Sequence, residues 1–170
     1  YYNLDNYPDN LTPGKGYMTK LIPPFTNIQY TGPLNNADVT IPVTGSSTNG
    51  WNAVGNPFTS AIGITESASS TENFLLKNNA VLDPSYQAIY LWYQTDGTPL
   101  GTGSYAPGDQ YYRTINNSGY TGKAYGGQIP ENNIQAGQGF LVNVSTNGNI
   151  VFTKNNVAGK FPALVKKLDA

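Results

Sequence analysis

The sequence predicts an all-β fold: a jelly-roll-like β-sandwich with two related hairpins and one short helix. Apolar and polar residues alternate over many short runs, which is typical of half-buried strands. Between these runs lie clusters of turn residues, from a total of 19 glycines and 12 prolines. An internal sequence repeat occurs once near each end of the chain. Many short strands with rich turns indicate a sandwich or a barrel.

All 170 residues are taken as a single domain, because this length is that of one domain with a sizeable core. The segment 161–170, ending in "VKKLDA", is interpreted as leading into a linker. The chain is therefore expected to be a segment of a larger protein, whose remaining domains would be its neighbours.

The repeat consists of "LTPGKGYMTKL" at 11–21 and "IQAGQGFLVNV" at 134–144, which align without a gap. Each copy is followed by a matching strand, "NIQYT" at 27–31 and "NIVFT" at 149–153. We interpret each copy and its following strand as a hairpin, so that the chain contains two matched hairpins. The Gly-x-Gly sequences are expected to form a tight turn or bulge at strand entry, since neither follows a strand and opens a helix as a phosphate loop does.

The period of two within each copy assigns one set of side chains to the interior. The residues expected inside are Tyr17, Thr19, Leu21, Ile28, Tyr30, Phe140, Val142, Val144, Ile150 and Phe152.

Further elements are expected between and after the copies. "ADVTIPVT" at 37–44 is predicted to be an edge strand, because Pro42 cannot donate to a ladder. "YQAIYLWYQ" at 86–94 has the highest β-propensity and is predicted to be central. "DQYYRTI" at 109–115 is another strand, and "FPALVKKL" at 161–168 is either a strand or a short helix.

Two segments depart from simple strands. "STENFLLKNN" at 70–79 has Ser or Thr before Glu and then three apolar residues, which fits a short N-capped helix. "GWNAVGNPF" at 50–58 begins as a strand and stops at Asn56, because a following proline disfavours helix. We interpret it as a structural corner with Trp51 in the core. The alternative exposes Trp51 as a stacking surface.

The composition excludes several classes of function. Cysteine and histidine are both absent, which removes Ser-His and Cys-His catalysis and His- or Cys-ligated metals. Charged residues make up 11% with a net charge of -1, so no basic surface for nucleic acid is expected. No apolar run reaches the roughly 18 residues of a membrane span. The neutral, hydrogen-bonding composition suits partners such as glycans.

Several motifs occur in a characteristic order: "GWNAVGNPFTSAI", "ENFLLKNN", "AIYLWYQ", "IQAGQGFLVNV" and "GNIVFTKN". In this order the chain resembles β-sandwich modules of large secreted and cell-surface Bacteroidota proteins, which carry a "GWNLVGNPYPSAIDW" type motif. The resemblance covers roughly residues 11–155. It implies type IX secretion and an extracellular or cell-surface location, in adhesins or polysaccharide-degrading enzymes. Where the family often has Ile-Asp-Trp this chain has Ile-Gly-Ile at 62–64, and Tyr93 replaces a frequent Asp, so a role of those acids does not transfer.

Aromatic residues of the 86–127 region are the candidate carbohydrate site, because rings supply apolar area and nearby polar groups orient hydroxyls. If Ile89 and Leu91 point inward, Tyr90 and Trp92 form an outward stripe; if both faces are buried, they are core. The tyrosines of the loops are alternatively surface residues that brace long loops. The candidate residues are Trp92, Tyr90, Tyr105, Tyr111, Tyr112, Arg113, Tyr120 and Tyr125.

Catalytic residues and cofactors are not expected. The chain has ten carboxylates, mostly in turns, and no pair shows a pattern that would place it across a cleft. Calcium is left open at "DNYPDN", residues 5–10, which is rich in oxygen ligands but lacks an EF-hand pattern.

The predicted function is that of a non-catalytic extracellular accessory module that binds a polysaccharide, a surface glycan or a surface protein through exposed aromatics. The alternative is a structural spacer or adhesion module without a ligand of its own. A carboxylate-dependent hydrolase is the third hypothesis.

Overall fold

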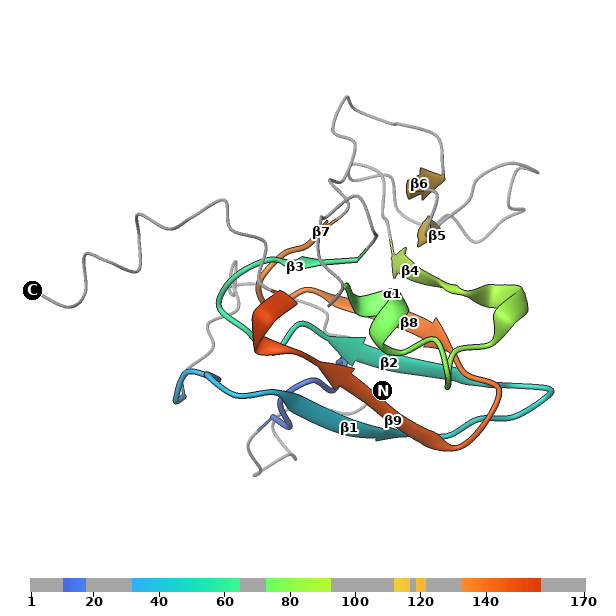
Figure 1. Cartoon of the computed structure of the whole chain (residues 1–170), viewed down its shortest axis with the longest axis horizontal. Helices are drawn as coiled ribbons and strands as arrows, with labels where there is room; N and C mark the ends of the chain where they lie inside the picture. Colours follow the sequence, from blue (N-terminus) through green and yellow to red (C-terminus); the bar gives the residue numbers. More distant parts are fainter. Residues whose placement is uncertain are drawn as a thin grey trace, which may run out of the picture.

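The all-β prediction is confirmed. The computed structural model describes residues 11–17, 32–64, 73–92, 112–116, 119–121 and 133–156. Within these ranges the chain forms antiparallel sheets, one short α-helix and 3-10 turns (Figure 1). The elements are β1 (Val39–Val43), β2 (Trp51–Gly55), β3 (Ile62–Gly63), α1 (Phe74–Lys77), η3 (Pro84–Tyr86), β4 (Ala88–Trp92), β5 (Tyr112–Asn116), β6 (Gly119–Thr121), β7 (Asn133–Ile134), β8 (Gly139–Asn143), β9 (Gly148–Phe152) and η4 (Lys154–Asn156).

The strands form a five-stranded sheet of order β2-β8-β4-β5-β6 and two smaller sheets, β1-β9 and β3-β7. Strand β4 lies between β8 and β5, so the prediction of a central strand at 86–94 is confirmed. Strand β1 pairs only with β9 within the described residues, and Pro42 faces Asn149 there. The predicted edge position of this proline is therefore confirmed.

Two arms of the chain, 39–63 and 133–152, run antiparallel along their whole length. The pairs β1-β9, β2-β8 and β3-β7 are nested one inside the next. The jelly-roll-like sandwich remains a prediction.

Strands β8 and β9 are not paired with each other, so the predicted hairpin at the second repeat copy is wrong. Each strand pairs with the opposite arm, and between them the chain crosses from one sheet to another. Glycines permit this crossing, because a Cβ at Gly50 would overlap the carbonyl oxygen of Val144. The two corners are joined by bonds from Val144 N to Gly50 O (2.8 Å) and from Gly45 N to the Asn147 side-chain oxygen (2.9 Å). The matching strand of the first copy, 27–31, lies outside the described residues.

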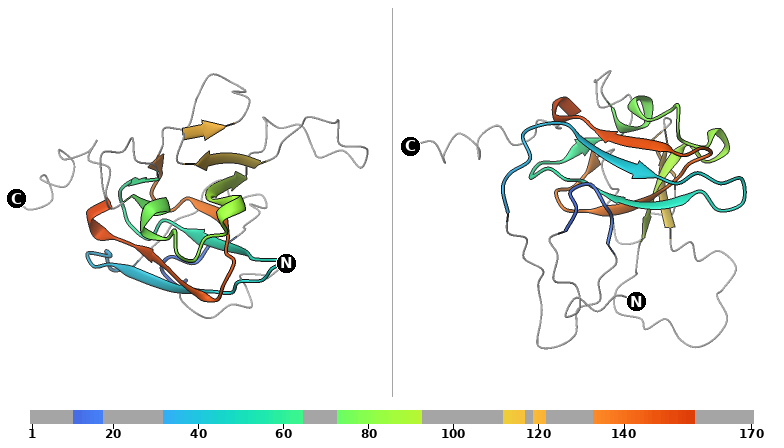
Figure 2. Two further views of the ribbon diagram at one scale, coloured as in Figure 1. Left: turned by 45° about the vertical axis from the view of Figure 1, so that its right-hand side comes forward. Right: turned by 90° about the horizontal axis from the view of Figure 1, so that it is seen from below.

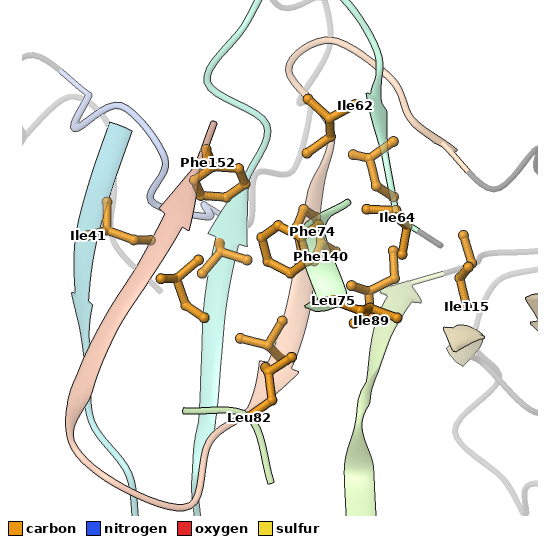
Figure 3. Packing of buried hydrophobic residues seen from close by; sticks show 14 of the residues in the cluster. Ile41, Ile62, Ile64, Phe74, Leu75, Leu82, Ile89, Ile115, Phe140 and Phe152 are labelled. Carbon is orange, nitrogen blue, oxygen red and sulfur yellow. The ribbon is translucent and has the colours of Figure 1, made fainter. Parts of the chain in front are cut away.

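The core lies between the five-stranded sheet, the β1-β9 ribbon and helix α1 (Figures 2 and 3). Its centre is a group of three aromatic rings, Phe74 of α1, Phe140 of β8 and Phe152 of β9. Their ring centroids are 5.2 Å apart for Phe74 and Phe140, and 5.3 Å apart for Phe74 and Phe152. Large buried rings in such contact are a major source of folding free energy.

Helix α1 confirms the predicted short helix but begins later than its sequence suggested. Its N-cap is Asn73, whose Oδ1 accepts from Leu76 N at 2.9 Å. Asparagine caps as well as serine or threonine do. At the other end Asn78 holds the helix to β9, since its side chain donates to Val151 O (3.0 Å) and accepts from Val151 N (2.8 Å).

The Gly-x-Gly sequences form the same tight turn twice, as predicted. Gly14 and Gly137 have positive φ angles of 83° and 69°. In each copy the residue after this glycine donates its N–H three residues back, from Lys15 to Thr12 (3.1 Å) and from Gln138 to Gln135 (3.2 Å). The repeat therefore encodes a turn.

The residues after the two turns differ in burial. Phe140 is 4% exposed, but Tyr17 at the matching position is 37% exposed, so the prediction of Tyr17 inside is wrong. The Tyr17 hydroxyl accepts from Thr12 N (2.9 Å), while Phe140 lies beneath Phe74. The predictions for Thr19, Leu21, Ile28, Tyr30 and 161–170 lie outside the described residues.

Candidate functional site

The outer face of the five-stranded sheet carries the candidate site. Val54, Ile89 and Phe140 point into the core, so the alternating positions point to the opposite face. The register places Ala53, Leu141 and Tyr90 side by side across β2, β8 and β4. Trp51 lies on the same face as Ala53, two residues away on β2.

Three side chains on this face form what we call the aromatic cluster: Trp51, Tyr86 and Tyr90. The Trp51 ring meets Tyr90 edge to face, with centroids 4.7 Å apart and planes at 88°. Tyr86 approaches Trp51 with centroids 6.0 Å apart. Trp51 is 42% exposed and Tyr86 49%, while Tyr90 is half-buried. The cluster is therefore ordered by ring contacts and still open on one side.

The turn at Asp83 brings Tyr86 to this face. Asp83 Oδ1 accepts from Ser85 N (2.8 Å) and so caps η3, with Pro84 at its first position. Asp83 N donates to Asn143 O (3.0 Å) on β8, and Asn143 is the partner of Trp51 in the register. The turn is thus attached directly beside the tryptophan.

The polar groups of the cluster are available for hydrogen bonds. Within the described residues no partner is found for the Trp51 indole N–H, for the hydroxyls of Tyr86 and Tyr90, or for the second oxygen of Asp83. Burial raises the pKa of Tyr90, and the nearby Tyr86 and Asp83 raise it further. The Tyr90 hydroxyl therefore keeps its proton at neutral pH and can donate it.

The structure shows how some residues of the predicted carbohydrate site are oriented. Ile89 and Leu91 are buried, so Tyr90 faces outward, and the alternative in which it is core is wrong. Trp92 is paired with Tyr112 in the register of β4 and β5, but the side chains of both lie outside what is described.

The remaining predicted residues are not brought to the cluster by the described part of the chain. Arg113 pairs with Leu91 and Tyr120 pairs with Ile115, both partners on the core face, and their own side chains are not described. The positions of Tyr105, Tyr111 and Tyr125 lie outside the described residues.

Three members of the site were not among the candidate residues named from the sequence. Asp83 was missed, Tyr86 lies in the predicted 86–127 region without being named, and Trp51 as a stacking surface was only the alternative. The prediction of Trp51 in the core is wrong, and the signal was present in its own strand. Val54 is buried, so an alternating strand places Trp51 outside.

The rest of "GWNAVGNPF" is the structural corner that was predicted. Asn56 is 5% exposed. Its Nδ2 donates to Ser60 O (2.8 Å), Ile134 O (3.2 Å) and Gln135 O (3.1 Å). Its Oδ1 accepts from Phe58 N at 3.0 Å. One side chain therefore fixes the corner between β2 and β3 and ties it to the opposite arm.

The described carboxylates Asp38 and Asp83 each accept from a backbone N–H, but only Asp83 does so within a turn of its own, as expected. Asp38 Oδ1 accepts from Lys154 N (2.9 Å), and Asp83 caps η3. No group of three His, Cys, Asp or Glu residues that could hold a metal occurs in the described ranges. The calcium candidate at 5–10 lies outside them. None of the helices in the described ranges is long and apolar enough to cross a membrane.

The fold and the site define an all-β protein with an open aromatic cluster on one face of a sheet. The chain belongs to the family described as Domain of unknown function (DUF8693), whose model matches residues 1–160. Comparisons with curated proteins and with solved structures give no match.

Proposed function

We propose that the chain is a non-catalytic module that binds carbohydrate or another surface partner through the aromatic cluster. The observation that carries the proposal is the gathering of Trp51, Tyr86 and Tyr90, from three separate elements, on the open face of the sheet.

Leaving Trp51 and Tyr86 nearly half exposed forgoes burial free energy, at about 25 cal/mol per Å² of apolar surface. Exposed tryptophan and tyrosine rings are enriched at binding interfaces, where one ring supplies large apolar area and a polar tip. This enrichment favours a binding role over a packing role for the cluster.

The chemistry of the cluster suits a sugar. A pyranose ring offers an apolar face that can stack on an aromatic ring, and its hydroxyls need hydrogen-bond partners. The indole N–H of Trp51 and the hydroxyls of Tyr86 and Tyr90 offer donors around the rings, and Asp83 offers an acceptor.

A role without catalysis is supported by the residue types present. The chain has no histidine and no cysteine. Asp38 accepts from the N–H of Lys154 at the start of η4, and Asp83 accepts from the N–H of Ser85 in η3. We therefore assign the cluster to recognition, and any reaction on the ligand to other domains of the parent protein.

The proposed location is extracellular or at the cell surface, after type IX secretion in a member of the Bacteroidota. The support is the resemblance of the ordered motifs. In cells that produce the full-length protein, added protease is expected to remove it from the surface while cytoplasmic markers survive; persistence of the intact protein would contradict this location.

The binding proposal is tested by affinity electrophoresis in gels that contain single polysaccharides: hydroxyethyl cellulose, xylan, mannan, starch, dextran, pectin and alginate. At least one is expected to retard the protein. Trp51→Ala is expected to weaken that retardation about tenfold or more, as loss of a central aromatic does. Tyr17→Ala is the matched control, since Tyr17 is also exposed and lies outside the cluster.

If no polysaccharide retards the protein, or if Trp51→Ala behaves as the wild type, the proposal of carbohydrate binding at this cluster fails. The spacer or adhesion module without a sugar ligand is then the better account.

A further inference from the structure

We infer that the aromatic cluster selects uncharged sugar units and discriminates against uronic or sulfated ones, with Asp83 as the residue that sets this preference. The inference rests on the proposed carbohydrate binding and adds the class of ligand.

Asp83 is a fixed part of the cluster. Its N–H bonds Asn143 O, and Asn143 is the register partner of Trp51. Its Oδ1 is held by Ser85 N at 2.8 Å. The first bond fixes the Asp83 backbone to β8, and the second fixes its carboxylate to the start of η3.

The charge of Asp83 reaches the rings. It contributes to raising the pKa of Tyr90, together with burial and Tyr86. A ligand stacked on Trp51 or Tyr90 would experience the same negative charge. The second oxygen of Asp83 can accept a hydroxyl proton from a sugar, and hydrogen bonds to a charged acceptor are stronger than neutral ones.

The described elements that carry the cluster supply no cation to offset this charge. The sequences of β2, β4, β8 and η3 contain no lysine or arginine. A carboxylate or sulfate on the ligand would therefore meet Asp83 without compensation, whereas a neutral hydroxyl meets a hydrogen-bond acceptor. The cluster consequently suits a neutral pyranose.

The test compares each neutral polysaccharide that retards the protein with its own carboxymethylated product, for example hydroxyethyl cellulose with carboxymethyl hydroxyethyl cellulose. The wild type is expected to bind the neutral member more tightly. Asp83→Asn is expected to keep the cap of η3, because asparagine also caps a turn, and to weaken binding of the neutral member, because a neutral amide oxygen replaces a charged acceptor. The same variant is expected to reduce the preference for the neutral member about fivefold at low salt.

Asp38→Asn is the matched control, because Asp38 also bonds a backbone N–H but lies outside the cluster. It is expected to leave the preference unchanged. Each variant is measured with the same pair of polymers. The steric effect of the carboxymethyl groups is therefore the same for every variant and does not affect the comparison of their preferences.

The inference is overturned if charged and neutral members bind equally, if only anionic polymers such as alginate are retained, or if Asp83→Asn leaves the preference as it was. In those cases loss of binding in Trp51→Ala would still support the proposed function. Absence of binding to every polymer overturns both.

Discussion

The two faces of the five-stranded sheet are built from the same strands and are used in opposite ways. On the inner face Val54 and Phe140 are buried beneath α1 and β9. On the outer face Trp51 and Tyr86 meet ring to ring and remain nearly half exposed. Packing explains the first face completely and the second only in part. The difference supports the proposal that the outer aromatics serve recognition.

The largest expected effect on stability comes from a substitution on the inner face of the sheet. Phe140→Ala removes a ring that contacts both Phe74 and Phe152, so it is expected to lower the free energy of unfolding by about 4 kcal/mol. Urea unfolding followed by circular dichroism measures this. A loss below about 1 kcal/mol would show that the inner face is not the core described.

The corner that joins β2 to β3 is the next most sensitive point. Asn56→Ala leaves the Phe58 N–H and the Ser60 carbonyl without their partner, at an expected cost of about 2 to 3 kcal/mol. Asn49→Ala, at an exposed position on the preceding corner, is the control and is expected to change stability by less than about 0.5 kcal/mol. Equal effects of the two substitutions would contradict the role of Asn56.

The contrast between the faces also shows what the sequence could and could not predict. Local alternation correctly placed Phe140, Val142 and Ile150 inside, because a strand has a fixed period of two. It failed for Trp51, where the general tendency of tryptophan to be buried outweighed the pattern of its own strand.

Long-range pairing was the other failure. The second repeat copy resembles a hairpin locally, but its strands pair with segments about a hundred residues earlier in the chain, as Val54 with Phe140 and Ile41 with Ile150. Backbone contacts at the corner glycines allow this long-range pairing of strands. A local sequence pattern contains no information about such contacts. Tyr86 and Asp83 were not named as site residues for the same reason, since the bond of Asp83 to Asn143 places them beside Trp51.

A smaller effect is expected from the outer face. Trp51→Ala is expected to lower the free energy of unfolding by only about 1 kcal/mol, the size of its edge contact with Tyr90. The same urea experiment measures it beside Phe140→Ala. A loss as large as that of Phe140→Ala would place Trp51 in the core and remove the contrast between the faces.

The smallest effect concerns the pH dependence of stability. The pKa of Tyr90 is raised in the folded protein, chiefly by burial. Above about pH 10 the unfolded chain therefore loses the Tyr90 proton first, and stability falls until the raised pKa is passed. Tyr90→Phe is expected to lessen this alkaline loss and to leave the pH dependence near pH 7 unchanged. Identical profiles of unfolding free energy from pH 7 to 11 would contradict it.

The most direct test of the account is the accessibility of Trp51 itself. Trp92→Phe leaves Trp51 as the single tryptophan, so acrylamide quenching of fluorescence reports on it alone. We predict efficient quenching in the free protein and marked protection when a retained polysaccharide is added to saturation. A tryptophan shielded from acrylamide in the free protein, or quenching that the polysaccharide leaves unchanged, would contradict the claim that this face binds sugar.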